Sequence, residues 1–341
     1  MKRYLTLVAL MFITLTACEH KDLCENHREH AHRYHINVVA DYRYDWEECC
    51  GGPNWLEEWP EHYINYDELR PSHPSGLRVV AYDKDGDYNI HNINADGGVV
   101  SLYEGFNDLL FYNNDTEYII FSRTGDGVTT RVTTRATTRA STRASYKGSP
   151  FANSNEPTLT PPDMLYANYF TDYLAEKVID PVDVEVTLYP LVYTYKIRYE
   201  FESGLEYVAM ARGVLTGMAS SVSLNTGETS EDPASLLFDC ELVDYGARAF
   251  VNSFGTPGYP NPNFGTRADN KHSLNLELLL RNGKTITYDY DVTDQVRIQP
   301  HGGVVVISGI VISEEDGTHG SGGWDVSVDD WGEYEDVPLP L

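Results

Sequence analysis

Apolar and polar residues alternate along much of this chain, and alternation with a period of two predicts β-strands with one buried face. The first clear case is residues 35–44, whose apolar face consists of Ile36, Val38, Ala40, Tyr42 and Tyr44. Residues 77–82 and 88–93 flank the acidic run 83–87, which has the Asp-Gly composition of a hairpin turn. Further short strands are predicted at residues 99–103, 108–112 and 118–122.

The alternation is clearer in the second half of the chain. Residues 191–201 predict a long strand with one buried face, and residues 205–215 are its expected partner. Residues 274–280 and 286–290 flank an Asn-Gly dipeptide, which strongly favours a hairpin turn. Residues 304–312 are apolar on both faces, and this pattern predicts a central strand of a sheet.

Two segments depart from the alternation. Between residues 161 and 174 the apolar side chains fall at helical spacing and predict a short helix; they are Tyr166, Tyr169, Phe170, Tyr173 and Leu174. Residues 129–145 repeat a four-residue unit of the type Thr-Thr-Arg-Ala. Because this repeat has no large apolar groups to bury, we expect it to form an exposed, mobile loop.

Many short strands joined by turns predict an all-β fold built from sandwiches or barrels. The 341 residues suffice for about two domains of ~100–200 residues each. We expect residues 35–180 to form an N-terminal domain that carries the 129–145 loop, and residues 181–341 to form a C-terminal domain.

The first residues predict an export signal. Lys2 and Arg3 precede an apolar run over residues 4–15, which is too short to span a bilayer as a stable helix. Small residues then lead into Cys18 in the manner of a bacterial lipobox, where the cysteine thiol receives a diacylglycerol before cleavage. The alternative is an ordinary signal peptide that ends near a cysteine.

The lipobox prediction divides the N-terminal region into two parts. Residues 1–17 are expected to be the lipoprotein signal peptide, and residues 18–34 are expected to be a polar tether that begins at the lipid-bearing Cys18. No later segment reaches the ~18 apolar residues that a membrane-spanning helix needs. Attachment to the membrane is therefore expected through acyl chains.

The chain is strongly acidic, with 25 basic and 52 acidic residues and a formal net charge of −27. Such a surface repels nucleic acid and anionic lipid head groups. We therefore expect no nucleic-acid partner.

The sequence contains no motif of catalytic or cofactor-binding spacing. A zinc-protease helix motif, a phosphate-binding loop, a nucleophile elbow and a dinucleotide-binding glycine pattern are all missing. We therefore predict no enzyme activity, no catalytic residues and no cofactor. Asp83, Asp85 and Asp87 resemble part of a calcium loop, but Gly86 and Asn94 do not fit its spacing, and a hairpin turn is favoured.

Histidines in the tether are the weak candidates for a metal site. His27, His30 and His32 lie within a few residues of Cys24, and imidazole with thiolate suits a soft divalent ion. The alternative is a mobile tether that carries histidines without a ligand. Cys24 could also form a disulfide with Cys49 or Cys50, although a sequence does not fix the pairing.

Aromatic residues allow a second interpretation. The chain has 25 tyrosines and 5 tryptophans, and aromatic rings can stack on sugars. Trp324 and Trp331 near the C-terminus would be the first residues to test. Strand packing explains the tyrosines as well, because tyrosine is favoured in strands.

Several short motifs follow one another in an order that resembles a known family. They are Asp22-Leu23-Cys24 after the lipobox, Arg212-Gly213-Val214 leading into residues 215–219, Asn252-Ser253-Phe254-Gly255, residues 291–296, and Gly323-Trp324-Asp325-Val326. Together they resemble a Bacteroides-type lipoprotein family of unknown function that is related to fimbrillins and to minor-fimbria anchor lipoproteins. The resemblance covers most of the mature chain.

This resemblance implies two tandem transthyretin-like β-sandwich domains and a role in fimbriae at the cell surface. Related fimbrial proteins assemble by strand donation, in which one protomer completes the open sheet of another. In several of them a trypsin-like protease cuts after an arginine and frees the first strand. Here that strand would be residues 36–44, with Arg43 as the nearest arginine, but the surrounding residues do not match the cleavage motif and we assign no cleavage site.

These observations lead to one hypothesis and one alternative. The hypothesis is a non-enzymatic, surface-exposed lipoprotein of the outer membrane that acts in fimbria assembly, anchoring or adhesion, with other fimbrial subunits as partners. The alternative is a surface lipoprotein that binds host or surface glycans.

Overall fold

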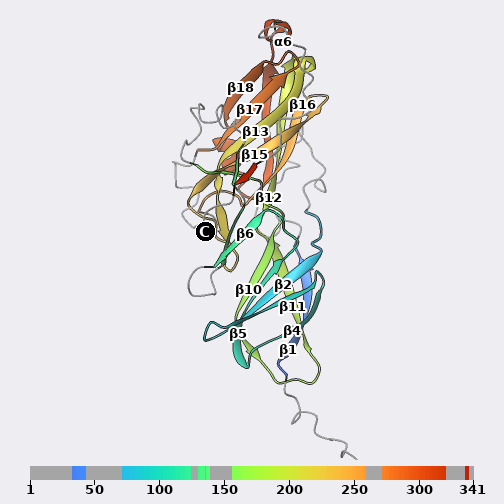
Figure 1. Ribbon diagram of the computed structural model, residues 1–341, viewed down its shortest axis with the longest axis vertical. Coiled ribbons are helices and arrows are strands. Elements are labelled where there is room, and N and C mark those ends of the chain that lie inside the picture. Colours follow the sequence, from blue (N-terminus) through green and yellow to red (C-terminus); the bar gives the residue numbers. More distant parts are fainter. Residues whose placement is uncertain are drawn as a thin grey trace, which may run out of the picture.

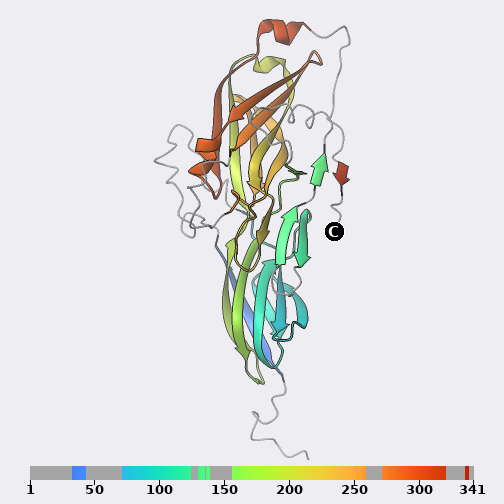
Figure 2. The ribbon, with the colours of Figure 1, turned by 90° about the vertical axis from the view of Figure 1, so that its left-hand side faces the viewer.

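The computed structural model describes residues 33–43, 71–123, 130–134, 136–138, 156–258, 271–319 and 335–337. Within these residues the chain is almost entirely β-structure, which confirms the predicted all-β class. Two β-structured units lie end to end along the long axis of the molecule (Figures 1 and 2).

The first unit is a closed barrel. Around the barrel, the strands follow the order β1 (His35–Tyr42), β11 (Val182–Pro190), β10 (Tyr166–Ala175), β5 (Gly105–Asn113), β2 (Gly76–Asp83), β3 (Tyr88–Asn94) and β4 (Gly97–Ser101). Pairing of β4 with β1 closes the barrel, and β1 runs parallel to β11. Because the strands form a continuous ring, the transthyretin-like sandwich expected here is not confirmed.

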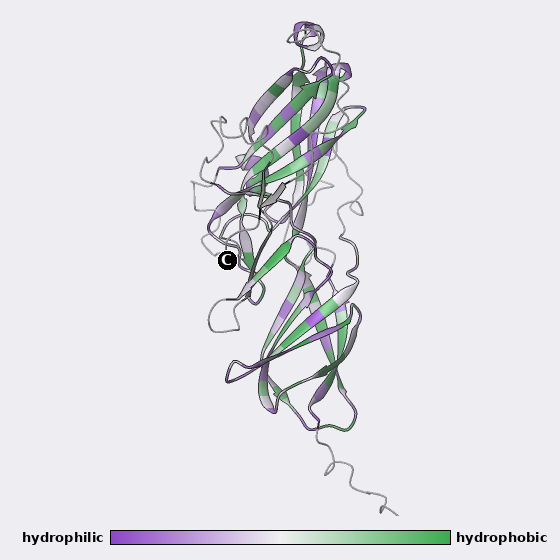
Figure 3. Cartoon of the chain, in the orientation of Figure 1, coloured by the Kyte–Doolittle hydropathy of each residue, from purple (hydrophilic) through white to green (hydrophobic). Residues whose placement is uncertain are grey.

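Apolar side chains from the barrel strands form the core of the first unit, and hydrophobic positions are green in Figure 3. Leu77, Val79, Leu109 and Phe111 are fully buried members of this core. The predicted hairpin over residues 83–87 is confirmed, because β2 and β3 pair up to Tyr82 and Tyr88.

One strand of the barrel lies beyond the predicted domain boundary. β11 (Val182–Pro190) pairs with β1 over seven residues, whereas a division at residue 180 assigns it to the second domain. The chain passes into the second unit after Pro190. β1 is far from β11 in the sequence, so their pairing leaves no local signal in the residues of β11.

The predicted helix over residues 161–174 is a strand instead. β10 (Tyr166–Ala175) pairs with β5, and its register shifts between Phe170 and Tyr173, where Asp172 has a φ of 53°. This bulge places Tyr166, Phe170 and Tyr173 against the same core. The extra residue therefore produces spacings of four and three, which imitate the apolar face of a helix.

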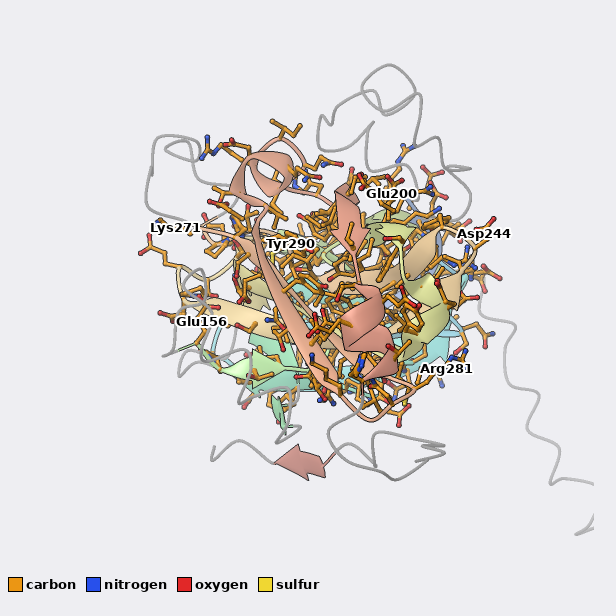
Figure 4. All side chains as sticks on the ribbon, turned by 90° about the horizontal axis from the view of Figure 1, so that it is seen from above. Glu156, Glu200, Asp244, Lys271, Arg281 and Tyr290 are labelled. Carbon is orange, nitrogen blue, oxygen red and sulfur yellow. The ribbon has the colours of Figure 1, made fainter. Side chains whose placement is uncertain are left out.

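The second unit contains a ten-stranded sheet. Its main path is β18 (Thr285–Asp291), β17 (Ser273–Leu280), β13 (Val208–Ala219), β15 (Pro233–Val243), β16 (Gly246–Ser253), β12 (Tyr193–Ser203) and β19 (Gly303–Val311), and β9 (Thr158–Leu159), β8 (Ala136–Thr138) and β20 (Glu335–Val337) extend it beside β15. The predicted hairpin at Asn282-Gly283 is confirmed between β17 and β18. Figure 4 looks down on this unit, with Arg281 at the hairpin and Tyr290 on β18.

The predicted central strand at residues 304–312 is instead at one end of the sheet path. β19 pairs with β12, and no other strand of the described residues pairs with it. Its apolar composition fits burial against the core, since Val304, Val305 and Ile310 are each at most 2% exposed. Burial of both faces does not require two neighbouring strands.

A small sheet and an apolar cluster join the two units. The sheet consists of β6 (Ile119–Arg123), β7 (Thr130–Thr134) and β14 (Ser221–Ser223). The cluster packs Tyr82 and Leu110 of the barrel with Val222, Leu224 and Phe254 of the second half.

The threonine–arginine repeat takes part in these sheets. Its beginning forms β7 and β8, which corrects the prediction of a loop for that part of residues 129–145. Threonine is a favourable strand residue, and pairing with neighbouring strands does not require large apolar side chains. Residues 139–145 of the repeat lie outside the described part of the chain.

Helical structure is limited to short turns among the described residues. They are η4 (Leu205–Tyr207), α5 (Thr293–Arg297) and α6 (Glu314–Thr318). None of the helices in the described residues is long and apolar enough to cross a membrane.

A buried ion pair lies between two central strands of the second unit. Arg212 on β13 faces Glu277 on β17, and its Nε donates to Oε1 of Glu277 over 2.9 Å. Neither side chain is more than 2% exposed. Alternation puts the neighbouring Ala211 in the core cluster, so the pair lies on the opposite face of the sheet.

We expect Glu277→Ala to lower the free energy of unfolding by about 3–5 kcal/mol, because it leaves a buried guanidinium without its carboxylate. Replacing both partners, with Arg212→Met and Glu277→Leu, should cost far less. The measurement is denaturant-induced unfolding.

The control for this prediction is the exposed pair Arg248–Glu241, whose Nε–Oε2 distance is 2.7 Å. Glu241→Ala should cost at most about 1 kcal/mol, because solvent screens an exposed pair. Equal losses for Glu277→Ala and Glu241→Ala would contradict a special role of the buried pair.

Candidate functional site

The strand that closes the barrel is also the first described strand of the chain. β1 pairs with β11 on one side, from Ile36 to Tyr42, and with β4 on the other, from His35 to Val39. Since no other described strand precedes it, β1 is connected to the rest of the barrel through its C-terminal end only. Removing β1 would leave β4 and β11 as two free edges on either side of an open groove.

The side chains of β1 alternate as the sequence predicts. Ile36, Val38 and Tyr42 are at most 4% exposed and belong to the barrel core, and Ala40 packs against the same core. The predicted face is therefore confirmed for these four residues. Val39, on the opposite face, is 42% exposed.

Tyr42 holds the C-terminal end of β1 in place. Its hydroxyl donates to the backbone oxygen of Ala95 over 2.9 Å, and its ring makes edge contacts with Tyr166 and His73. The strand ends at Tyr42, two residues before the predicted end, and Tyr44 lies outside the described residues. The nearby Arg43 donates its backbone N–H to Leu188 over 2.9 Å.

The partner strand β4 is shaped to fit the β1 backbone. A Cβ atom on Gly97 would lie 1.9 Å from the backbone oxygen of Val38, and the φ of Gly97 is 127°. Only glycine is compatible with that approach and that backbone angle. On the other side, Nδ2 of Asn37 donates to Oδ1 of Asp183 over 2.7 Å.

A cavity of about 380 Å³ forms a second candidate site where the two units meet. Asn113, Asp115 and Asp163 line it from the barrel side, and Phe250 and Asn252 of β16 line it from the other. Phe250 is 43% exposed. The two carboxylates in this lining, Asp115 and Asp163, suit a ligand that donates hydrogen bonds.

Hydrogen bonds hold the polar groups of this cavity in place. Asn113 donates to Oδ1 of Asp115 over 2.7 Å, and Oδ2 of Asp163 accepts the backbone N–H groups of Glu117 and Tyr118. Burial favours protonation of Asp115, but hydrogen bonds from Asn113 and Ser75 outweigh it and keep the pKa of Asp115 below its usual value. Asp115 is therefore an ionised acceptor at neutral pH.

Most residues named by the sequence as candidate sites lie outside the described part of the chain. This holds for the lipid-attachment residue Cys18, for the weak metal candidates His27, His30 and His32, and for Cys24, Cys49, Cys50, Trp324 and Trp331. Among the described residues, no three His, Cys, Asp or Glu side chains gather as a metal site.

The acidic hairpin is the one described candidate. Oδ1 of Asp83 accepts the backbone N–H groups of Asp85 and Asp87, each over 2.9 Å. This is the turn that short acidic side chains stabilise, as the hairpin interpretation predicts. The cavity has no signal in the sequence, because its lining residues come from segments far apart in the chain.

Comparison with known proteins gives matches to one family and to several solved structures. Residues 64–239, more than half of the chain, match a family described as a domain of unknown function (DUF5119). No curated protein sequence matches the chain.

The structure is similar to a protein from Bacteroides ovatus that is proposed to be an adhesin. The TM-score is 0.53 at 19% identity, and the match covers 88% of this chain and 95% of that one. At this identity the likeness concerns the fold.

Two proteins from Porphyromonas gingivalis match less closely, both at 12% identity. The fimbrial anchor protein Mfa2 has a TM-score of 0.41, with 80% of this chain and 90% of that one covered. The tip fimbrial protein Mfa3 has a TM-score of 0.32, with 75% and 81% covered.

The resemblance to a family of unknown function, predicted from short motifs, is confirmed by the family match over residues 64–239. The chain belongs to the DUF5119 family.

Proposed function

We propose that this protein is a non-enzymatic lipoprotein of the cell surface that acts in fimbria assembly, anchoring or adhesion by exchanging strands with other fimbrial subunits. The two units would correspond to the tandem transthyretin-like modules of fimbrillin-related proteins, with the first module closed into a barrel by its own first strand. The fold shared with a proposed adhesin of Bacteroides ovatus supports this assignment.

The observation that carries the proposal is the position of β1. The strand has hydrogen-bonded neighbours on both sides and places apolar side chains at every second position. Among the described strands, the main chain connects it to the others through its C-terminal end only. An incoming strand with the same alternation could therefore take over both sets of backbone hydrogen bonds and fill the same pockets. Strand exchange would leave the connections among β2, β5, β10 and β11 intact.

The lipid anchor is a further part of the proposal. Residues 1–17 would be the signal peptide, Cys18 would carry the acyl chains, and residues 18–34 would lead from the membrane to β1. Because tether and first strand would be one continuous segment, only a cut in the chain after β1 would separate the remaining strands from the lipid anchor. Loss of the segment through such a cut would free a subunit with an open groove for polymerisation.

A disulfide across β1 and β4 should block assembly. Ala40 donates its backbone N–H to the backbone oxygen of Asp96, so these two opposite residues form a hydrogen-bonded pair. Hydrogen-bonded and non-hydrogen-bonded pairs alternate along an antiparallel ladder, and Asn37 opposite Val99 is therefore a non-hydrogen-bonded pair. The Cα atoms of such a pair lie about 4.5 Å apart, within the range of a disulfide. We expect Asn37→Cys with Val99→Cys to abolish the ladder of oligomers from cell-surface material on non-denaturing gels.

Reduction of the disulfide should restore the oligomers, and each single cysteine variant should assemble like the wild type. Oligomers that persist in the oxidised double variant would contradict exchange of β1. Wild-type material that stays monomeric in every condition would contradict polymerisation altogether.

Replacing the predicted lipid-attachment residue should release the protein from the membrane. We expect Cys18→Ala to abolish incorporation of radiolabelled palmitate and to move the protein from the envelope to the soluble fraction, because acyl chains would be its attachment. Cys24→Ala is the control and should keep the label. An envelope-bound Cys18→Ala variant would contradict the anchor.

The cavity between the units favours a second candidate function, the binding of a neutral glycan. The carboxylates of Asp115 and Asp163 would accept hydrogen bonds from sugar hydroxyls, and Phe250 would offer a face for the sugar ring. The strongly acidic chain disfavours anionic sugars.

If the cavity binds glycans, Phe250→Ala should weaken the binding of any array-positive glycan by about fivefold, the effect of losing roughly 1 kcal/mol of aromatic contact. Phe106→Ala is the matched control, because Phe106 is 55% exposed and lies on β5, outside the cavity. A glycan array without any positive signal would remove this candidate.

A further inference from the structure

The second unit has an edge strand that needs protection. β19 pairs with β12 on one side, and no other strand of the described residues pairs with its second side. A strand with unpaired N–H and C=O groups is a template for pairing with another chain. Its apolar sequence and its length of nine residues make β19 a favourable template.

Two glutamine side chains occupy the free side of β19. The side chain of Gln295 accepts the backbone N–H of Val306 over 2.9 Å and donates to the backbone oxygen of the same residue over 3.0 Å. Gln299 does the same at Val304, over 2.7 and 3.0 Å. We call these two side chains the glutamine clamp.

The clamp reproduces the hydrogen bonds of a neighbouring strand. Val304 and Val306 are two residues apart, so their N–H and C=O groups point to the same side of β19. A carboxamide carries an N–H donor and a C=O acceptor side by side, as an extended residue of a neighbouring strand does, and its NH2 group has a second N–H. Gln295 and Gln299 are also the only glutamines in the chain.

The clamp is built on an anchored support. Gln295 lies on α5, and Val296 beside it is fully buried in the core cluster of the second unit. The hydroxyl of Tyr195 donates to the backbone oxygen of Gln299 over 2.8 Å. A Cβ atom on Gly303 would lie 2.0 Å from Oε1 of Gln299, so the close approach of this amide requires glycine there.

The far end of the same edge is also covered. Tyr288 of β18 donates its hydroxyl to the backbone oxygen of Val311 over 3.1 Å. Between the clamp and Val311, Gly309 has a φ of 80° and the register with β12 shifts. A bulge there interrupts the regular edge, which itself opposes strand pairing.

We infer that the glutamine clamp closes the β19 edge against strand addition by a second copy of this chain, so that strand exchange is confined to the first unit. Only the statement that strand exchange is confined to the first unit rests on the proposed function. The closure of β19 is a property of the second unit and can be tested separately.

The test is self-association of the full-length mature chain without its clamp. We expect Gln295→Ala with Gln299→Ala to self-associate at least about tenfold more tightly than the wild type in sedimentation velocity, because edge-to-edge pairing becomes available. Adding Val306→Pro should restore the monomer, since the Val306 N–H faces the free edge and proline there removes a donor without disturbing β12.

A background with the Asn37→Cys/Val99→Cys disulfide separates this inference from the proposed function. Association through β19 persists when β1 is locked, whereas association that disappears overturns the inference. A folded double alanine variant that remains monomeric at all concentrations also overturns it.

Hydrogen exchange of single variants provides a measurement that needs no association. Gln295→Ala should accelerate exchange of the Val306 amide, and Gln299→Ala that of the Val304 amide, with each leaving the other protected. Unchanged exchange at both amides would show that the clamp does not shield the edge.

Discussion

The backbone hydrogen bonds at the edges of the sheets are the interaction on which this structure depends. Each unit contains strands that would be free edges without a specific partner, and free edges attract other chains. In the first unit, β1 supplies that partner for both β4 and β11. In the second unit, the side chains of Gln295 on α5, of Gln299 just after it and of Tyr288 on β18 take this role along β19.

The two solutions differ in how easily they can be reversed. β1 is a terminal segment among the described strands, and its hold consists of ladder bonds and the anchors Ile36, Val38 and Tyr42. A second strand can replace all of these interactions with equivalents, so exchange need not cost much free energy. The glutamine clamp instead sits on an internal turn whose Val296 is buried in the core, and moving it would expose apolar surface.

The sequence predicts strands well where alternation is unbroken, as in β1 and the hairpin of β17 and β18. It fails at β10, because the bulge at Asp172 converts a period of two into helical spacing. It also assigns β11 to the second unit and β19 to the centre of a sheet. The pairing of β11 with the distant β1 and the coverage of β19 by glutamine side chains leave no local pattern in these strands. The closing strand could be predicted from its apolar face, whereas its partners, the cavity and the clamp depend on contacts between distant residues.

The topology gives the proposed anchoring and assembly a common physical basis. The segment that would run from a lipid on Cys18 leads directly into β1, so a force or a cut on the tether acts on the strand that closes the barrel. An uncut chain would keep this strand, its closed barrel and the proposed attachment, while a chain cut after the strand could lose it and would have an open groove. If the groove opens only after that cut, anchoring and acceptance of a donor strand would be alternative states of one molecule. The closed β19 edge makes that coupling effective, because a second accepting edge would let attached chains associate without releasing β1.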